Sequence, residues 1–324
     1  MDHLENKLNQ LKTILMEQVK NKSVPLPRII HVETRSKCNG TCGFCPASTK
    51  TDTRKDIFMP DNLIEKIINE LSKLHYKDRL SFYNNNEPFI DKRIFEIIKL
   101  AREKLPKTYL ELKSNGIVLN MDKIITIFNN GLDTLYISDY TDSDQYSDNI
   151  LSIKNELNTI RRFKGHLEGS CYFKRIIITH CGMNIKKGTR AGLSPNREKL
   201  KHHISAPCFR PFEMMTISPE GKVSVCSEDF YHAMFMGNIQ NDNLINIWQS
   251  DKWNTIRNEL LNNHRHFTHE CSMCDYKGFT YEMLAEHNLF DANDNITPQF
   301  QPIKKEDASL KKVIFSHLKR YFNR

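Results

Sequence analysis

Three closely spaced cysteines constrain this chain more than any other feature of its 324 residues. Three residues separate Cys38 from Cys42, and two separate Cys42 from Cys45. The motif directly follows the apolar run RIIHVET (28–34), which predicts a short buried strand. A cubane [4Fe–4S] cluster takes four thiolates. Three thiolates on one loop would therefore leave one iron free to bind a small molecule.

A structural zinc site is the alternative for these cysteines. His31 or a distant residue would then complete a Cys3His set. Structural zinc sites usually combine one CxxC with a second CxxC or with two histidines, and CxxxCxxC fits that pattern poorly.

Composition excludes several classes of protein. Nine cysteines are too few and too unevenly clustered for a disulfide scaffold. The sequence shows neither a secretory signal nor an apolar run of about 18 residues. We therefore expect a cytoplasmic protein, since a reducing compartment preserves an oxygen-labile cluster. The net charge of +8 is scattered over polar helix faces, so nucleic-acid binding is not indicated.

Short apolar runs alternate with amphipathic segments between residues 28 and 180. This order predicts parallel strands with helical crossovers, and five or six such units favour an α/β fold with a partial (β/α)6 TIM-like barrel. Ligand chemistry in such barrels gathers at the carboxyl ends of the strands, where the three cysteines lie. The predicted strands are 29–33, 80–83, 109–113, 134–138 and 173–179, and the predicted helices are 4–20, 61–74, 92–104, 121–129 and 147–163.

Four further cysteines follow the predicted barrel, with 17, 44 and 2 residues between them: Cys208, Cys226, Cys271 and Cys274. The stretch 218–226 predicts a hairpin with apolar residues on either side of a Pro-Glu-Gly turn and a second strand that ends on Cys226. Residues 244–248 then lead into a helix that packs towards the CxxC. A four-cysteine zinc ribbon is the alternative here.

The CxxxCxxC motif after a first strand resembles the radical S-adenosylmethionine (SAM) superfamily. The resemblance implies that SAM chelates the open iron and that its reductive cleavage yields a 5′-deoxyadenosyl radical, which removes a hydrogen atom from a substrate. The spacing of the later cysteines resembles the SPASM family in its shortened twitch form, as found in enzymes of aminocyclitols and sugars. The cofactors implied are SAM and two [4Fe–4S] clusters, one of them auxiliary and held by four thiolates.

The same resemblance implies a set of SAM contacts at the strand ends. The NNEP loop (85–88) stands where the family has GGE and would hold the methionine ammonium, although both glycines are missing. A turn after the third strand would meet the ribose and carboxylate, and a serine after the fourth would meet the ribose. An aromatic residue before the third cysteine would lie beside the adenine. An ordinary asparagine-rich turn before a proline is the alternative for the loop. The implied residues are Phe44, Asn86, Glu87, Pro88, Ser114, Asn115 and Ser138.

Two residues are candidates for a catalytic role at the substrate. Arg190 lies in a TRAG segment (189–192) that resembles one in this group of enzymes, where an arginine is placed near the substrate. It would hydrogen-bond a hydroxyl and stabilise an oxyanion, or else be a surface arginine in a turn. Cys171 and Cys181 stand near the ends of the fifth predicted strand, and small buried apolar cysteines are the default. The alternative is that one, Cys181 in our choice, donates a hydrogen atom to a substrate radical.

The predicted organisation has four parts. An amphipathic helix (1–27) precedes the radical SAM partial barrel (28–205), which a small α+β twitch-like cluster domain (206–290) follows. The segment 291–324 is predicted as a linker and a basic amphipathic helix (309–323). We expect that helix to dock on its own domain. The alternative is that it contacts an anionic membrane surface.

The sequence therefore predicts a radical SAM oxidoreductase, and the favoured substrate is a sugar or cyclitol that is dehydrogenated or epimerised at an alcohol carbon. Modification of a ribosomal peptide is the second hypothesis. Only 27 residues precede the first strand, which disfavours a leader-binding domain. A non-catalytic zinc protein is the third. The expected electron donor is a flavodoxin or a ferredoxin.

Overall fold

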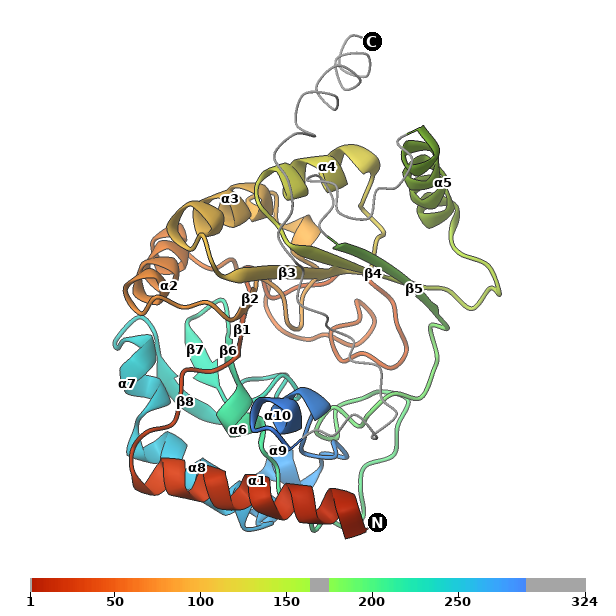
Figure 1. Ribbon diagram of the computed structural model, residues 1–324. Helices are drawn as coiled ribbons and strands as arrows, with labels where there is room; N and C mark the ends of the chain where they lie inside the picture. Colours follow the sequence, from red (N-terminus) through yellow and green to blue (C-terminus); the bar gives the residue numbers. More distant parts are fainter. Residues whose placement is uncertain (1, 164–174, 290–324) are drawn as a thin grey trace.

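One mixed β-sheet runs through the described part of the chain, which comprises residues 2–163 and 175–289 of the computed structural model (Figure 1). The strand order is β5-β4-β3-β2-β1-β6-β7-β8. Strands β1 to β6 pair in parallel, whereas β7 is antiparallel to both of its neighbours. The strands are β1 (Ile29–Val32), β2 (Arg79–Ser81), β3 (Tyr109–Ser114), β4 (Thr134–Tyr140), β5 (Arg175–Cys181), β6 (Met214–Ile217), β7 (Lys222–Ser224) and β8 (Phe235–Asn238).

Four helices connect the first five strands, as the alternating sequence pattern predicted. They are α2 (Asp61–Lys73), α3 (Ile94–Lys104), α4 (Met121–Asn129) and α5 (Asp148–Phe163). Each predicted element of this region is present, with described ends within two residues of the prediction. In α2 the buried residues Ile64, Ile67, Ile68 and Leu71 recur at helical spacing and make one apolar face. The α/β fold class is confirmed.

The sixth parallel strand, β6, does not have the position expected for the last strand of a sixth βα unit. β6 does not continue the order beyond β5 but pairs with β1 on its other side, with Ile29 opposite Met214. Between β5 and β6 the chain forms only the short helix α6 (Arg210–Glu213). All four residues of β6 are buried. A short apolar run carries no signal for which edge of a sheet it joins, so the sequence could not supply this pairing.

β6 lies within the region that carries the later cysteines, between Cys208 and Cys226, so this region continues the barrel sheet. The predicted hairpin is formed by β6 and β7. Its later helices are α7 (Leu244–Trp248), α8 (Asp251–Leu261), α9 (His269–Ser272) and α10 (Tyr281–Glu286), with the short 3-10 turn η2 (Arg265–Phe267) between α8 and α9. A second 3-10 turn, η1 (Pro88–Ile90), lies in the first region, between β2 and α3. Asn243, Ser250, Thr268 and Thr280 each accept a hydrogen bond from the first turn of α7 to α10 respectively, which explains where these helices begin.

The first helix, α1 (Asp2–Lys20), lies across this second region (Figure 1). It contacts α8 and α10, and Leu11 and Leu15 are 0% and 2% exposed. The predicted amphipathic lead-in helix is therefore present and packed. Among the described residues, no helix is long and apolar enough to cross a bilayer. The predicted linker and tail helix, 291–324, lie outside the described residues.

Candidate active site

The three cysteines of the first motif lie together on the loop that leaves the carboxyl end of β1. The amide of Gly40 donates to Cys38 Sγ at 3.3 Å. A Cβ atom on Gly40 would stand 3.4 Å from Cys38 Sγ and 3.8 Å from Cys42 Sγ, so both sulfurs lie beside this residue. Burial raises the pKa of Cys38 to about 12 and that of Cys42 to about 11. Binding a metal here therefore releases protons from the thiols.

Glu87 joins the loop after β2 to the turn after β3. Its Oε1 accepts from Ser114 Oγ at 2.8 Å and from the amide of Phe89 at 3.1 Å, and its Oε2 accepts from the amide of Asn115 at 2.7 Å. The side-chain amide of Asn115 lies 3.6 Å from Cys38 Sγ and donates to Asn39 Oδ1 at 2.8 Å. The two strand-end loops thus meet at the cysteine loop, as predicted. Glu87 is already bound to three donors of its own chain.

The remaining predicted SAM contacts line the same edge of the sheet. Asn86 accepts from the amide of Asn84 at 3.0 Å, and its own side-chain N–H group is buried without a hydrogen-bond partner. Pro88 begins η1. Ser138, on β4, accepts from Thr179 Oγ1 at 3.3 Å.

Phe44 belongs to an aromatic pair that encloses a lysine. Its ring centroid lies 5.3 Å from that of Tyr140. Lys187 Nζ lies 4.5 Å from the Phe44 centroid and 3.2 Å from the Tyr140 hydroxyl. The charge of Lys187 also acts on Cys42, where it opposes the rise in pKa caused by burial. Sequence reasoning missed Lys187 and Tyr140, although Tyr140 follows the predicted Ser138 by two residues.

Arg190 lies between the front loop and the second set of cysteines. It donates to Asn85 Oδ1 and forms an ion pair with Glu228 at 3.5 Å. Burial alone lowers the pKa of Arg190, but Glu228, Cys45 and Cys226 outweigh burial and raise it. The positive charge of Arg190 therefore lies close enough to both Cys45 and Cys226 to interact with them, between the two sets of cysteines. The backbone of Arg190 is left-handed, with φ of 51°. A residue other than glycine keeps this conformation only where the surrounding contacts hold it there.

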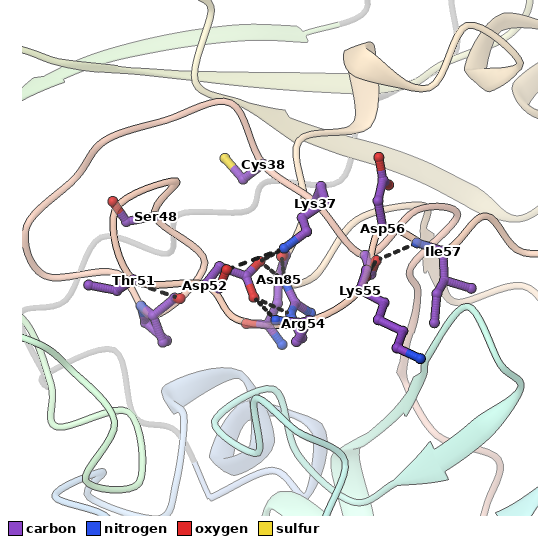
Figure 2. A network of polar contacts seen from close by, with 12 residues as sticks. Lys37, Cys38, Ser48, Thr51, Asp52, Arg54, Lys55, Asp56, Ile57 and Asn85 are labelled. Carbon is purple, nitrogen blue, oxygen red and sulfur yellow. Dashed lines mark hydrogen bonds and ion pairs between the residues drawn. The ribbon is translucent and has the colours of Figure 1, made fainter.

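Glu33 is a buried anion at this edge that sequence reasoning placed only in a strand. Its carboxylate is 0% exposed and lies 3.3 Å from Arg54 Nη1 and 3.6 Å from His232 Nε2. Arg54 also donates to Asp52 and to the carbonyl of Asn85, as Figure 2 shows. Burial favours a raised pKa for Glu33, but His232 and then Arg54 lower it overall. No local motif marks this contact, because its partners lie on separate loops.

The four later cysteines line one cavity, whose empty space measures ≈ 400 Å³ with open solvent included. Burial raises the pKa of Cys271 and of Cys274 to about 12. Within residues 2–163 and 175–289, no three histidine, cysteine or carboxylate side chains are grouped closely enough to hold a single metal ion. Tetrahedral zinc needs four sulfurs at about 2.3 Å from one centre. Four thiolates are also the ligand set of a [4Fe–4S] cluster, so the cysteines that line this cavity fit such a group.

Family models match both of the regions that carry the clustered cysteines. Residues 32–187 match the radical SAM superfamily, and residues 208–275 match the SPASM iron–sulfur cluster-binding domain. The chain belongs to the radical SAM superfamily. As in that superfamily, it uses SAM and a [4Fe–4S] cluster, and its SPASM region adds auxiliary iron–sulfur binding.

One curated relative of this radical SAM protein is the S-adenosyl-L-methionine-dependent 2-deoxy-scyllo-inosamine dehydrogenase of Niallia circulans. The two are 26% identical over 252 residues, which is 76% of this chain and 92% of the relative.

Solved structures share the fold. The crystal structure of BtrN in complex with AdoMet and 2-DOIA has a TM-score of 0.65 and 23% identity, and covers 78% of this chain and 94% of its own. BtrN in an open conformation has a TM-score of 0.55 and 20% identity, with coverages of 79% and 99%. Streptococcus suis SuiB bound to the precursor peptide SuiA has a TM-score of 0.52 and 13% identity, with coverages of 76% and 70%.

Cys181 ends β5 directly opposite Tyr140. Its carbonyl accepts from the amide of Thr141 at 3.1 Å, and its side chain is partly buried. This radical SAM protein therefore has a free thiol at the same edge of the sheet as Tyr140 and Phe44. Cys171 lies outside the described residues.

Proposed function

We propose that this radical SAM protein oxidises an alcohol-bearing carbon of a sugar or cyclitol to a carbonyl. The position of Arg190 between the front cysteine loop and Cys226 carries the proposal. A polar substrate held there would have a radical source on one side and an electron acceptor on the other. The named activity of the Niallia circulans relative, a cyclitol dehydrogenase, supports the same substrate class.

The cysteines divide into two proposed ligand sets. Cys38, Cys42 and Cys45 hold the SAM-binding cluster, and their number leaves one iron for the amino and carboxylate groups of SAM. The auxiliary cluster takes all four of its ligands from the cavity, namely Cys208, Cys226, Cys271 and Cys274. When bound, the front cluster and SAM supply the 5′-deoxyadenosyl radical, and the auxiliary cluster accepts one electron.

The proposed SAM contacts follow the strand-end loops. Asn86, Glu87 and Pro88 shape the pocket for the methionine ammonium. Glu87 acts through the loops that it joins, because three donors already occupy its carboxylate. Ser114 and Asn115 lie towards the carboxylate and ribose, Ser138 towards the ribose, and Phe44 towards the adenine.

The residues around the substrate have separate roles in the proposed oxidation. The carbon-bound hydrogen leaves as an atom and forms 5′-deoxyadenosine. The hydroxyl then loses its proton and the carbon loses one electron, which leaves a C=O bond. Arg190 donates to the hydroxyl oxygen and stabilises its negative charge as the proton leaves. The side-chain N–H group of Asn85, which is buried and has no hydrogen-bond partner, is a second donor towards a polyol.

A direct test incubates the reconstituted protein anaerobically with SAM, a reductant and a panel of sugars and aminocyclitols deuterated at single carbinol positions. We expect one substrate to lose two hydrogen atoms, with its deuterium recovered in 5′-deoxyadenosine. A flavodoxin or ferredoxin is the proposed physiological donor and should replace the chemical reductant.

Other products would reject the dehydrogenase. An inverted stereocentre without a change of oxidation level indicates an epimerase, and Cys181 is then the proposed hydrogen donor, so that Cys181→Ala abolishes inversion. A crosslinked peptide in the same assay, with sugars unchanged, indicates peptide modification.

A further inference from the structure

Two buried arginines line the cavity of the four later cysteines, and the proposed oxidation has not used them. They are Arg210, at the start of α6, and Arg265, at the start of η2. Arg265 is 1% exposed, so its charge lies in a medium of low dielectric constant.

Among residues 2–163 and 175–289, the hydrogen-bond partners of Arg265 are backbone carbonyl groups. Its guanidinium donates to the carbonyls of Ala206 at 3.0 Å, Pro207 at 3.2 Å and Tyr276 at 2.7 Å. In the described part of the chain no carboxylate lies within ion-pair distance of it. Ala206 and Pro207 directly precede Cys208, and Tyr276 follows Cys274 by two residues. Arg265 therefore ties together two segments that carry ligands and adds a positive charge without a counterion.

Arg210 lines the same cavity and follows Cys208 by two residues. Its Nη1 bonds Glu213 at 3.0 Å, its guanidinium lies 4.2 Å from the centroid of the Tyr276 ring, and its Nε is buried without a hydrogen-bond partner.

The carboxylates of the cavity are largely engaged elsewhere. Glu228 forms its ion pair with Arg190. Asp229 accepts from Ser224 Oγ at 2.6 Å and from the amides of Ala233 and Met234 at 2.9 and 2.8 Å. Glu270 also lines the cavity and is partly exposed, so water screens its charge. Within the described residues, Arg265 is thus a buried charge at this site with no carboxylate within ion-pair distance.

We propose that Arg265 and Arg210 raise the reduction potential of the auxiliary cluster and thereby make it the acceptor of the substrate's electron. A cubane cluster with four thiolates carries a net charge of about −2 when oxidised, and one more negative charge when reduced. A nearby buried cation stabilises the more negative state more strongly. The proposal rests on the proposed function, in which one electron leaves the substrate carbon after the hydroxyl proton.

The test is a redox titration of the holoenzyme without substrate, followed by electron paramagnetic resonance. Addition of SAM alters the signal of the front cluster, which has an open iron, and so separates the two clusters. Arg265→Met and Arg210→Met should each shift the electron-transfer equilibrium at least tenfold against reduction of the auxiliary cluster, about 59 mV for one electron. Arg265→Lys and Arg210→Lys keep the charge and should shift it clearly less.

Arg257→Met is the matched control. Arg257 is also 0% exposed, lies in α8, and bonds the carbonyls of Pro211 and Trp248, but it does not line the cysteine cavity. We expect no shift of the auxiliary potential in this variant. Iron content identifies any variant that loads its clusters incompletely. If Arg265→Met loads its clusters incompletely, the comparison of Arg210→Met with Arg210→Lys decides the proposal.

The proposal is overturned if the methionine variants at Arg210 and Arg265 keep the potential of the Arg257 control. Because the potential is measured without substrate, this result is independent of the reaction catalysed. A shifted potential in a protein that oxidises no alcohol would retain the role of the arginines and reject the proposed function. With the substrate present, we expect less ketone per SAM cleaved in the methionine variants.

Discussion

At the scale of single residues, Glu87 shows how one carboxyl group couples the cysteine loop to pH. Burial raises the pKa of Glu87 to about 7, against hydrogen bonds that lower it. Its ordinary value is 4.5. A carboxyl group with a higher pKa in the folded protein binds its proton more tightly there. Its contribution to stability is therefore complete below pH 4.5 and is lost as the pH rises through about 7.

We predict that Glu87→Gln removes this pH dependence from the cluster-free protein. The variant should lose about 1–3 kcal/mol of unfolding free energy at pH 5, because its new NH2 group faces the amide of Asn115 and leaves a buried donor unpaired. Denaturant unfolding at several pH values measures both effects. Glu96→Gln, on the exposed face of α3, should keep the slope of the wild type. An unchanged slope between pH 5 and 7 in Glu87→Gln would assign the titration to another group.

Arg190 makes a second residue-scale prediction, on catalysis. Arg190→Lys keeps the charge but loses the planar fork that reaches Asn85 and Glu228. We expect kcat/KM for the alcohol to fall about 10- to 100-fold, which corresponds to one hydrogen bond to a charged group. SAM cleavage should continue without coupled product, and iron content should stay constant.

The comparison for this change is Arg197→Lys, in the same segment, where the partner is Asp275 at 3.4 Å. Arg197 is partly exposed, and we expect its variant to retain full coupling of SAM cleavage to oxidation. Equal behaviour of the two variants would mean that Arg190 only supports the fold.

At the scale of elements, the turn after β3 depends on Gly116. Its φ is +78°, and a Cβ atom there would lie 2.6 Å from Ile150 Cδ1 and 2.9 Å from Ile137 Cγ2. Gly116→Ala should cost about 1–2 kcal/mol for the left-handed backbone alone and displace the turn that carries Asn115. We therefore expect weaker SAM binding, measured by equilibrium titration of the reconstituted protein. Ile117→Ala, which changes an exposed neighbour, should bind SAM normally.

Helix α1 makes a prediction about the stability of the second region. Leu11 belongs to α1 and is 0% exposed, and α1 contacts α8 and α10. Leu11→Ala should cost about 2–5 kcal/mol through the cavity that it leaves, and so lower Tm by several degrees. Leu4, on the same helix, is 36% exposed, and Leu4→Ala should leave Tm nearly unchanged. Calorimetry compares the two, and a similar Tm for both would show that α1 contributes little to the fold.

At the scale of the whole molecule, the sequence predicts the elements that local patterns mark, but not the pairings between distant segments. The strands, the helices and the strand-end position of the first cysteines follow from periodicity and order along the chain. The pairing of β6 with β1 and the contact of Glu33 with His232 join distant segments, and no local signal marks them. Lys187 was missed for the same reason, because Phe44 reaches it from another loop. The positions of the cysteines at the strand ends could thus be predicted, whereas the buried charges around them could not.

The two proposed cluster sites should also be separable by mutation across the whole molecule. Two [4Fe–4S] clusters require about eight iron atoms per chain, so Cys42→Ala and Cys226→Ala should each retain about four. Cys42→Ala removes a ligand of the radical source, and SAM cleavage should stop. Cys226→Ala removes a ligand of the acceptor instead, so SAM should still be cleaved while no ketone forms. Cys181→Ala is the control and should keep its iron and its dehydrogenase activity. Ketone formed by Cys226→Ala at the wild-type rate would mean that the electron leaves by another route.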